Sequence, residues 1–339
     1  MISCYHPARC SRSVHAAGGT IWESTAEVTR KAVVQAAPER AWSLVTDSAA
    51  WSLRPGQFAF DLPQVTGEGW LRCWFVPFGN GLGCSVQEVR EEVPGQVMSL
   101  QSRGTQPAGR QAFTLSVQPH ERGAEVWLTV RVTVPREDRA DYQAFWRKAL
   151  TAWLSALADV AEGRRPWPEA GIPASLQRAC ADLPVLASPQ GTATAVFIGA
   201  SPDVVWQAIR APGVPPDPRQ PYAAICAGRV PGAPERQPGE MRYVIVRHAD
   251  GRLIALASMV RELAEGRSVV TQRLEPPHYE VRYRVEPAPG GTRLQLTLCW
   301  PDAPVTEEGE QLRSRLTQAL QATASAYQAA IEPGGAGPT

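Results

Sequence analysis

The sequence lacks the patterns that mark several large classes of protein. Its seven cysteines are scattered and odd in number, and no Cys-x-x-Cys pair occurs, so neither a disulfide framework nor a zinc site is predicted. Its five histidines are dispersed, which argues against an iron site of two histidines and a carboxylate. A Gly-x-Ser-x-Gly elbow and a glycine-rich phosphate loop before a helix are also absent. We therefore expect no metal, no cofactor, and reduced thiols in a cytoplasmic protein.

Charge imbalance and long apolar runs are absent too. Lys and Arg (34) nearly balance Asp and Glu (33), so no strong field points to nucleic acid as a partner. No window approaches the roughly 18 continuous apolar residues of a membrane span. Residues 1–24 lack the apolar centre of a secretory signal, and we expect them to form a disordered leader.

What the sequence does contain is an internal repeat. The segment Ala37-Pro38-Glu39-Arg40-Ala41-Trp42 returns as Ser201-Pro202-Asp203-Val204-Val205-Trp206, an offset of 164 positions. Three further matches follow in the same order, and they join Val89-Arg90-Glu91 to Val260-Arg261-Glu262, Val117-x-Pro119 to Val285-x-Pro287, and Leu150-Thr151 to Leu316-Thr317. A period of this size is that of a domain rather than of a solenoid repeat. We expect two copies of one domain at 25–166 and 191–333, with a linker at 167–190 and a flexible tail at 334–339.

Each copy predicts the same order of elements. A β-branched strand (27–34 and 194–198) precedes a helix that starts at a proline, with Ser201 as the N-cap in copy two. Several strands of period-two alternation follow, among them a half-buried strand over 278–285. A long amphipathic helix ends each copy, at about 138–162 and 307–331. The predicted fold class is α+β: two tandem helix-grip domains, each a curved antiparallel sheet wrapped around a long C-terminal helix, which leaves a cavity between sheet and helix.

A strand followed by Ala/Ser-Pro-acidic-x-x-Trp, an antiparallel sheet and a terminal helix resembles the START-like (SRPBCC) superfamily. Copy one adds Thr46-Asp47-x-x-x-Trp51, which looks like that family's threonine–aspartate element, whereas copy two has Arg210-Ala211-Pro212-Gly213 there. The resemblance covers both copies and implies a fold more than a function. The superfamily includes lipid and hydrophobic-ligand carriers, polyketide aromatase/cyclases, iron-containing hydroxylase subunits and co-chaperone-like activators. Bacterial aromatase/cyclases made of two such domains are similar in length and layout.

Side chains that this fold would place around a cavity are the candidate ligand-binding residues. They are Arg72, Trp74, Arg242, Tyr243, Tyr279, Tyr283, Leu316, Ala319, Leu320 and Thr323, with Glu88 and His248 as further polar candidates. Alternation leaves open whether Arg72 and Arg242, equivalent in the repeat, face the cavity or are solvated strand residues. His248, beside a turn, is equally an exposed turn residue. Tyr279 and Tyr283 share a face with valines, which suits core packing as well as catalysis. No residue is assigned a catalytic role.

Three functions fit these observations. The first is binding of a small hydrophobic, lipid- or polyketide-like molecule in a helix-grip cavity. The second is a metal-free polyketide aromatase/cyclase that acts on a poly-β-ketone held by an acyl carrier protein. The third is a protein-interaction module whose cavities are filled by their own tryptophans. Because Ala319 stands where copy one has Trp153, we expect the more open cavity in copy two and a chiefly structural copy one.

Overall fold

The structure is a computed structural model that describes most of the chain. The described residues are 23–54, 56–66, 69–78, 81–102, 111–169, 171–183, 190–211, 222–248, 251, 253–275, 278–300 and 307–332. The predicted tail and all but the last two residues of the predicted leader lie outside them. The chain divides into two compact units, which are described one at a time.

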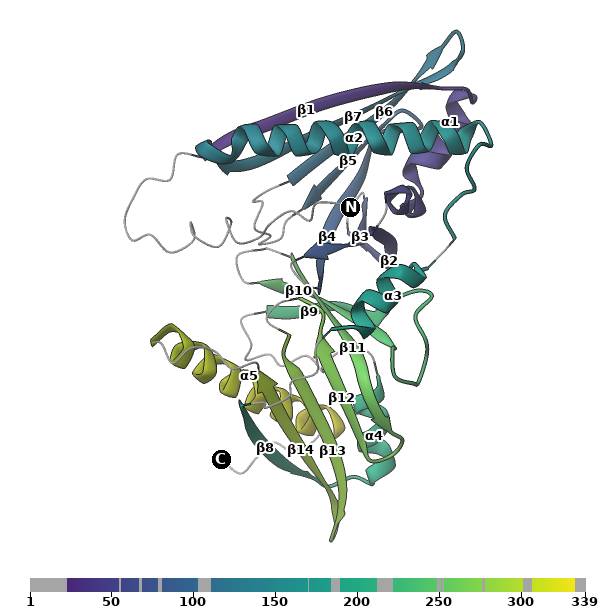
Figure 1. Ribbon diagram of the computed structural model, residues 1–339. Helices are drawn as coiled ribbons and strands as arrows, with labels where there is room; N and C mark the ends of the chain where they lie inside the picture. The colour runs from purple at the N-terminus through teal and green to yellow at the C-terminus, as the bar shows by residue number, and fades with distance from the viewer. Residues whose placement is uncertain are drawn as a thin grey trace. The chain divides into compact units, whose positions relative to one another are not determined.

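Unit 1 contains a seven-stranded antiparallel sheet and one long helix (Figure 1). Its strands are β1 (Glu23–Val34), β2 (Phe58–Thr66), β3 (Gly69–Phe78), β4 (Gly81–Val93), β5 (Val97–Ser102), β6 (Gln111–His120) and β7 (Gly123–Pro135). Its helices are α1 (Pro38–Thr46), the short 3-10 helices η2 (Ser48–Leu53) and η3 (Arg136–Asp138), and α2 (Arg139–Ala161). The strand order is β1-β7-β6-β5-β4-β3-β2, and α2 lies along β1.

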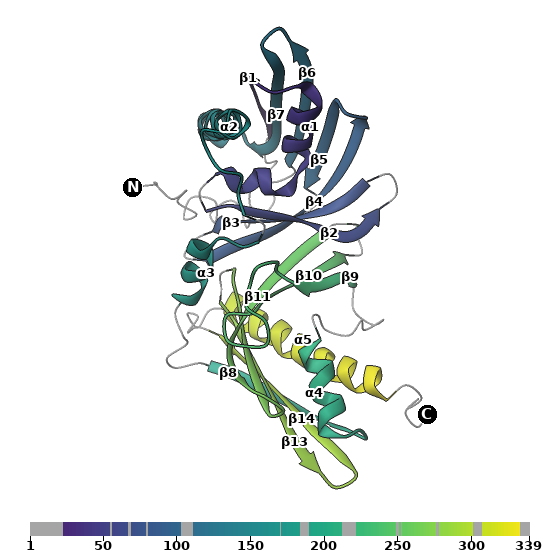
Figure 2. The same ribbon diagram turned by 90° about the vertical axis from the view of Figure 1, so that its right-hand side faces the viewer.

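Unit 2 repeats this arrangement. Its strands are β8 (Gln190–Ile198), β9 (Tyr222–Arg229), β10 (Met241–His248), β11 (Leu253–Ala264), β12 (Ser268–Arg273), β13 (Glu280–Ala288) and β14 (Gly291–Trp300). Its helices are α3 (Ala174–Ala181), α4 (Pro202–Arg210) and α5 (Glu307–Ile331). The order β8-β14-β13-β12-β11-β10-β9 is the order of unit 1, and α4 and α5 both pack against β14 (Figure 2). The predicted fold class, two tandem helix-grip domains, is confirmed.

The local signals for helices account for most element boundaries. Pro38 and Pro202 begin α1 and α4, where a missing N–H and a fixed φ suit the first turn. The long helices occupy the predicted ranges to within a residue. Ser201 is the N-cap of α4, as predicted, although its side chain makes no capping hydrogen bond. A side-chain cap occurs instead in unit 1, where Asp47 accepts from the N–H of Ala49 at 2.8 Å and starts η2.

The prediction of a half-buried strand over 278–285 was also wrong for the polar positions nearest its start. His278 and Glu280 are 5% and 1% exposed. Both are satisfied locally: Arg282 Nη2 donates to Glu280 Oε2 at 3.2 Å, and His278 Nδ1 lies 3.1 Å from the carbonyl oxygen of Arg273. Polar side chains with such partners can be buried, and alternation alone does not reveal the partners.

The segment expected as a linker contains an ordered helix. Helix α3 groups with unit 2, and Arg261 fastens its C-terminal end. The Arg261 guanidinium donates to the carbonyl oxygens of Cys180, Ala181 and Leu183 at 3.0–3.2 Å. The last carbonyl oxygens of a helix have no hydrogen-bond partner within the helix, so an arginine guanidinium is a suitable donor for them.

Candidate functional site

The candidate site lies on the inner face of each sheet, meaning the face that packs against α2 or α5. In unit 1 this face is filled by aromatic rings. The ring of Trp51 in η2 lies 5.8 Å from those of Trp74 and Trp153 and 5.4 Å from that of Phe113. Trp146 on α2 lies 5.3 Å from Phe113. These four tryptophans are at most 6% exposed, so the interior of unit 1 is packed with its own side chains.

Some polar atoms inside unit 1 have no hydrogen-bond partner among the described residues. They include the indole N–H groups of Trp51, Trp74 and Trp146 and the amide of Gln87. The indole of Trp153, by contrast, donates to the carbonyl oxygen of Ala50 at 2.8 Å. A buried donor or acceptor without a hydrogen-bond partner is unfavourable, so these polar groups reduce the stability that the packed aromatic rings give unit 1.

Arg72 occupies the inner face of β3 and is fully buried. Its Nε donates to Asp61 Oδ1 at 2.7 Å, and its Nη2 donates to the carbonyl oxygen of Thr46, the last residue of α1, also at 2.7 Å. The arginine therefore caps α1 and carries one neutralising carboxylate. For Arg72 the alternative of a solvated strand residue was wrong, because the end of α1 gives the guanidinium a buried partner.

Arg242 on β10 repeats this role in unit 2. It is 8% exposed, and its Nη1 donates to the carbonyl oxygen of Ile209 in the last turn of α4 at 3.3 Å. Its Nε donates to Glu240 Oε1 at 2.6 Å. The solvated alternative was wrong here too, for the same reason.

The carboxylate beside Arg242 is shared with other arginines. Glu240 is fully buried, and it accepts from Arg210 Nη2 at 2.9 Å and from the backbone N–H of Arg236 at 2.7 Å. Arg229 Nε lies 3.5 Å from it. Burial raises the pKa of the Glu240 carboxyl, but the hydrogen bonds and charges of Arg242 and Arg210, with the Arg236 N–H, outweigh burial and lower this pKa. Glu240 is thus a buried anion.

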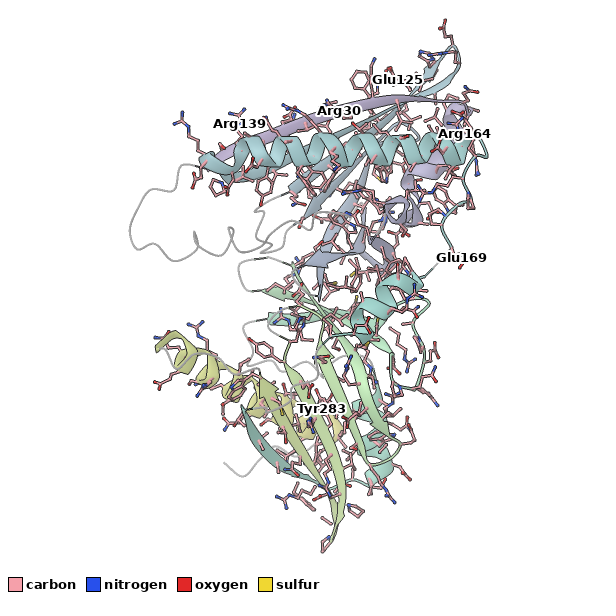
Figure 3. All side chains as sticks on the ribbon, viewed as in Figure 1. Arg30, Glu125, Arg139, Arg164, Glu169 and Tyr283 are labelled. Carbon is pink, nitrogen blue, oxygen red and sulfur yellow. The ribbon has the colours of Figure 1, made fainter. Side chains whose placement is uncertain are left out.

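Two tyrosines lie on the inner side of unit 2, and the charge of Arg242 acts on the pKa of both. Tyr283 on β13, labelled in Figure 3, has its ring 6.1 Å from that of Tyr327 on α5, and the two hydroxyls interact. Burial raises the pKa of Tyr283 to about 12, although the charge of Arg242 opposes this. Burial also raises the pKa of Tyr327 well above its ordinary value. Both hydroxyls therefore remain protonated near neutral pH and can donate hydrogen bonds.

The apolar lining of unit 2 is less complete than that of unit 1. Val281, Leu316 and Thr323 are half-buried, and Leu320 is 5% exposed. The repeat places Phe113, Leu150 and Leu157 of unit 1 at the positions of the first three, and each of these is at most 2% exposed. Ala319, at the position of Trp153, is exposed. Unit 2 thus has a smaller side chain at two of the first three positions, and all three are less buried than in unit 1.

Of the remaining candidates, Tyr279 packs against the same hydrophobic core of unit 2, whereas Tyr243 and Glu88 do not join this group. Tyr243 is buried, but it follows Arg242 in the strand and so faces the other side of the sheet, over Gly228. Tyr279 is half-buried with the Arg273 guanidinium 6.0 Å from its ring. Glu88 is paired with Arg90 at 3.3 Å. The side chain of His248 lies outside the described part of the structure.

Sequence reasoning missed three residues that complete the surroundings of Arg242. Glu240, Arg210 and Arg229 were not among the candidates, although the repeat carries a signal for two of them. Arg210 ends α4 where Thr46 ends α1. Arg229 pairs directly with Arg242 where Asp61 pairs directly with Arg72. An arginine at each position, where the other copy has a threonine and an aspartate, is the pattern that points to this place.

Within the described ranges, no group of three His, Cys, Asp or Glu side chains lies together that could hold a metal ion. The helices among these residues include none that is long and apolar enough to cross a membrane.

Comparison with known proteins gives likenesses of structure only. No protein-family model and no curated protein matches the chain. Among solved structures, the di-domain aromatase/cyclase StfQ from the steffimycin biosynthetic pathway matches with a TM-score of 0.34 and 14% identity, covering 91% of this chain and 97% of its own. The di-domain aromatase/cyclase BexL from the BE-7585A pathway gives 0.33 and 18%, over 92% of this chain and 99% of its own. The single Zhui aromatase/cyclase from a Streptomyces species gives 0.37 and 15%, over 42% of this chain and 98% of its own. At these scores and identities the likeness adds nothing to the assignment of a function.

Proposed function

We propose that the chain is a two-domain member of the START-like superfamily, and that unit 2 binds a small, largely apolar molecule between α5 and the inner face of its sheet. The observation that carries this proposal is the half-burial of Val281, Leu316 and Thr323, whose counterparts in unit 1 are fully packed. Apolar side chains left open on an inner face gain from contact with an apolar ligand, by about 25 cal/mol per Å² of surface removed from water. Tyr283 and Tyr327 offer the few polar contacts that would orient it.

The test exchanges residues between the units. The double variant Val281→Phe/Thr323→Leu gives unit 2 the side chains that unit 1 has at these positions, which should fill the proposed site. We expect it to bind a neutral apolar dye such as Nile red at least about tenfold more weakly than the natural protein, a loss of about 1.4 kcal/mol. Dye fluorescence titration measures this, with the melting temperature as a check on folding.

Val204→Phe is the matched control, because it adds a phenylalanine at a position of α4 that is 52% exposed. It should leave dye affinity unchanged. The proposal fails if the natural protein does not bind the dye, or if the double variant folds and binds it as tightly.

A second candidate is a polyketide aromatase/cyclase that takes its poly-β-ketone from an acyl carrier protein. It is favoured by one observation, the pair of Tyr283 and Tyr327, whose rings lie 6.1 Å apart and whose pKa values burial raises and the charge of Arg242 partly lowers. A guanidinium stabilises an enolate, and a tyrosine hydroxyl donates a hydrogen bond to a carbonyl oxygen as negative charge develops there. A carrier returns its ligand unchanged, so conversion of a poly-β-ketone that Tyr283→Phe abolishes would support this candidate instead.

A further inference from the structure

The surroundings of the two equivalent arginines differ in charge. In unit 1, Arg72 faces one carboxylate, Asp61, which is its direct partner across β2 and β3. In unit 2, the direct partner of Arg242 is another arginine, Arg229, and the end of α4 supplies a third, Arg210. Only one carboxylate among the described residues, Glu240, touches all three. Among the described residues, a neutral pair in unit 1 thus corresponds in unit 2 to a cluster with a surplus of two positive charges.

All of this cluster except Arg229 is buried. Glu240 is 0% exposed, Arg210 6% and Arg242 8%, while the side chain of Arg229 is 32% exposed and forms the accessible edge. Burying unpaired charge is unfavourable by several kcal/mol per ion, so buried arginines are ordinarily matched by anions. The carbonyl oxygen of Ile209 offsets only part of the charge, because a helix C-terminus carries about half an elementary charge.

Each of the three arginines also keeps an N–H without an acceptor among the described residues. These are Arg210 Nη1, Arg242 Nη2 and Arg229 Nε, the last of which lies 3.5 Å from Glu240 Oε1 without donating a hydrogen bond to it. Glu240 is already engaged: its Oε1 accepts from Arg242, and its Oε2 accepts from Arg210 and from the backbone of Arg236. Free donors on three guanidinium groups around one shared carboxylate form an arrangement that suits an anionic oxygen group.

The backbone at Glu240 points the same way. Arg236 has a φ of 53°, and it is a non-glycine residue in the left-handed region. This conformation is unfavourable for an L-residue, and here it directs the Arg236 N–H at Glu240 Oε2. The unfavourable backbone conformation of Arg236 thus helps to hold the Glu240 carboxylate in place. Because Arg210 and Arg242 donate to this carboxylate, their guanidinium groups are held in place as well.

We propose that Arg210, Arg229 and Arg242 form a binding site in unit 2 for an anionic oxygen group, a carboxylate or a phosphate, with Glu240 as the fixed counter-charge that positions the arginines. The inference goes beyond the proposed function, since it concerns an anion and stands whether or not an apolar ligand binds. Where both hold, the ligand of unit 2 carries an acidic group on an apolar body.

The test measures the melting temperature of the full chain against inorganic phosphate at constant ionic strength, with chloride as the balancing ion. A ligand that binds only the folded state stabilises it by RT ln(1 + L/Kd), where L is the free ligand concentration, so the melting temperature rises with ligand concentration. We expect phosphate to raise it for the natural protein. The variant Arg229→Asp places the charge of unit 1 at the equivalent position, and it should weaken phosphate binding at least tenfold.

A specific loss is separable from misfolding. Without phosphate, Arg229→Asp should melt no lower than the natural protein, because the new carboxylate neutralises the surplus charge internally. The control Arg267→Asp makes the same charge change at an exposed position in the turn between β11 and β12, and it should keep the phosphate response. The proposal is overturned if phosphate acts no more strongly than chloride on the natural protein, or if both variants respond alike.

A second arm identifies the source of the anion. If the acidic group belongs to an apolar ligand, decanoate should bind more tightly than both acetate and decanol, and Arg229→Asp should remove the advantage over decanol. If decanoate and acetate bind alike and need Arg229, the site takes a free anion. If the natural protein responds to phosphate but does not bind Nile red, the proposed function alone is overturned. If it binds Nile red but does not respond to phosphate, this inference alone is overturned.

Discussion

The two units share one strand order and one arginine position, yet they fill the space around that arginine differently. In unit 1 four tryptophans occupy the inner face, and Arg72 has its charge matched by Asp61. In unit 2 Val281, Ala319 and Thr323 are smaller than their counterparts, and Arg242 belongs to a cluster that has more positive than negative charge among the described residues. The difference teaches that the arginine itself has a structural role, because it caps α1 in unit 1 and α4 in unit 2. What distinguishes unit 2 is the set of residues around it.

The largest effect should come from removing the buried indole ring of Trp153, which packs against Trp51 in the interior of unit 1. Trp153→Ala deletes a residue that is 1% exposed and leaves the carbonyl oxygen of Ala50 without its donor. We expect the free energy of unfolding of unit 1 to fall by about 3–5 kcal/mol. Urea denaturation followed by circular dichroism measures the change.

The reciprocal variant tests the comparison directly. Ala319→Trp puts the ring at the equivalent, exposed position of α5, where we expect a change within about 0.5 kcal/mol. Equal losses for the two variants would show that the units depend equally on this position and would break the comparison.

An intermediate effect should follow from the charge cluster. Glu240→Gln removes the one described counter-charge of three arginines, and we expect a loss of about 3 kcal/mol in unit 2. Because the pKa of Glu240 is lowered by its arginines, its contribution is complete above the ordinary glutamate pKa and is lost as the pH falls through the lowered value. Glu240→Gln should therefore also remove part of the acid sensitivity of unit 2, as thermal melts across the acid range would show.

Asp61→Asn is the matched variant in unit 1. It leaves Arg72 with the carbonyl oxygen of Thr46, and the Asp61 side chain is 40% exposed, so the loss should be smaller. If Asp61→Asn lowers the free energy of unfolding more than Glu240→Gln does, then the arginines of unit 2 do not depend more on their carboxylate than Arg72 does.

Much of this fold follows from the sequence, because the repeat states it twice. The proline-initiated helices and the terminal helices lie where local signals place them. Each of these signals acts over a few residues, and tertiary packing supports it in both units. The equivalence of Arg72 and Arg242 was visible for the same reason.

The surroundings of the site could not be predicted in the same way. Arg210 and Arg229 lie far apart in sequence from one another, and only the pairing of β9 with β10 and the packing of α4 bring them to Glu240. Alternation places a residue on one face of a strand but does not show which helix end meets that face. For this reason buried arginines looked like solvated ones, and Tyr243 was grouped with Arg242 although adjacent strand residues face opposite ways.

The smallest effect concerns the helix starts, where the two units differ in side-chain capping. Ser201 stands at the N-cap of α4 without a side-chain hydrogen bond, so Ser201→Ala should change the stability of unit 2 by less than about 0.5 kcal/mol. Asp47→Ala removes the hydrogen bond to the N–H of Ala49 in unit 1, and it should cost about 1 kcal/mol. Chemical denaturation of both variants gives the two values. A loss at Ser201 as large as that at Asp47 would mean that its hydroxyl caps α4 in solution, which would remove this difference between the units.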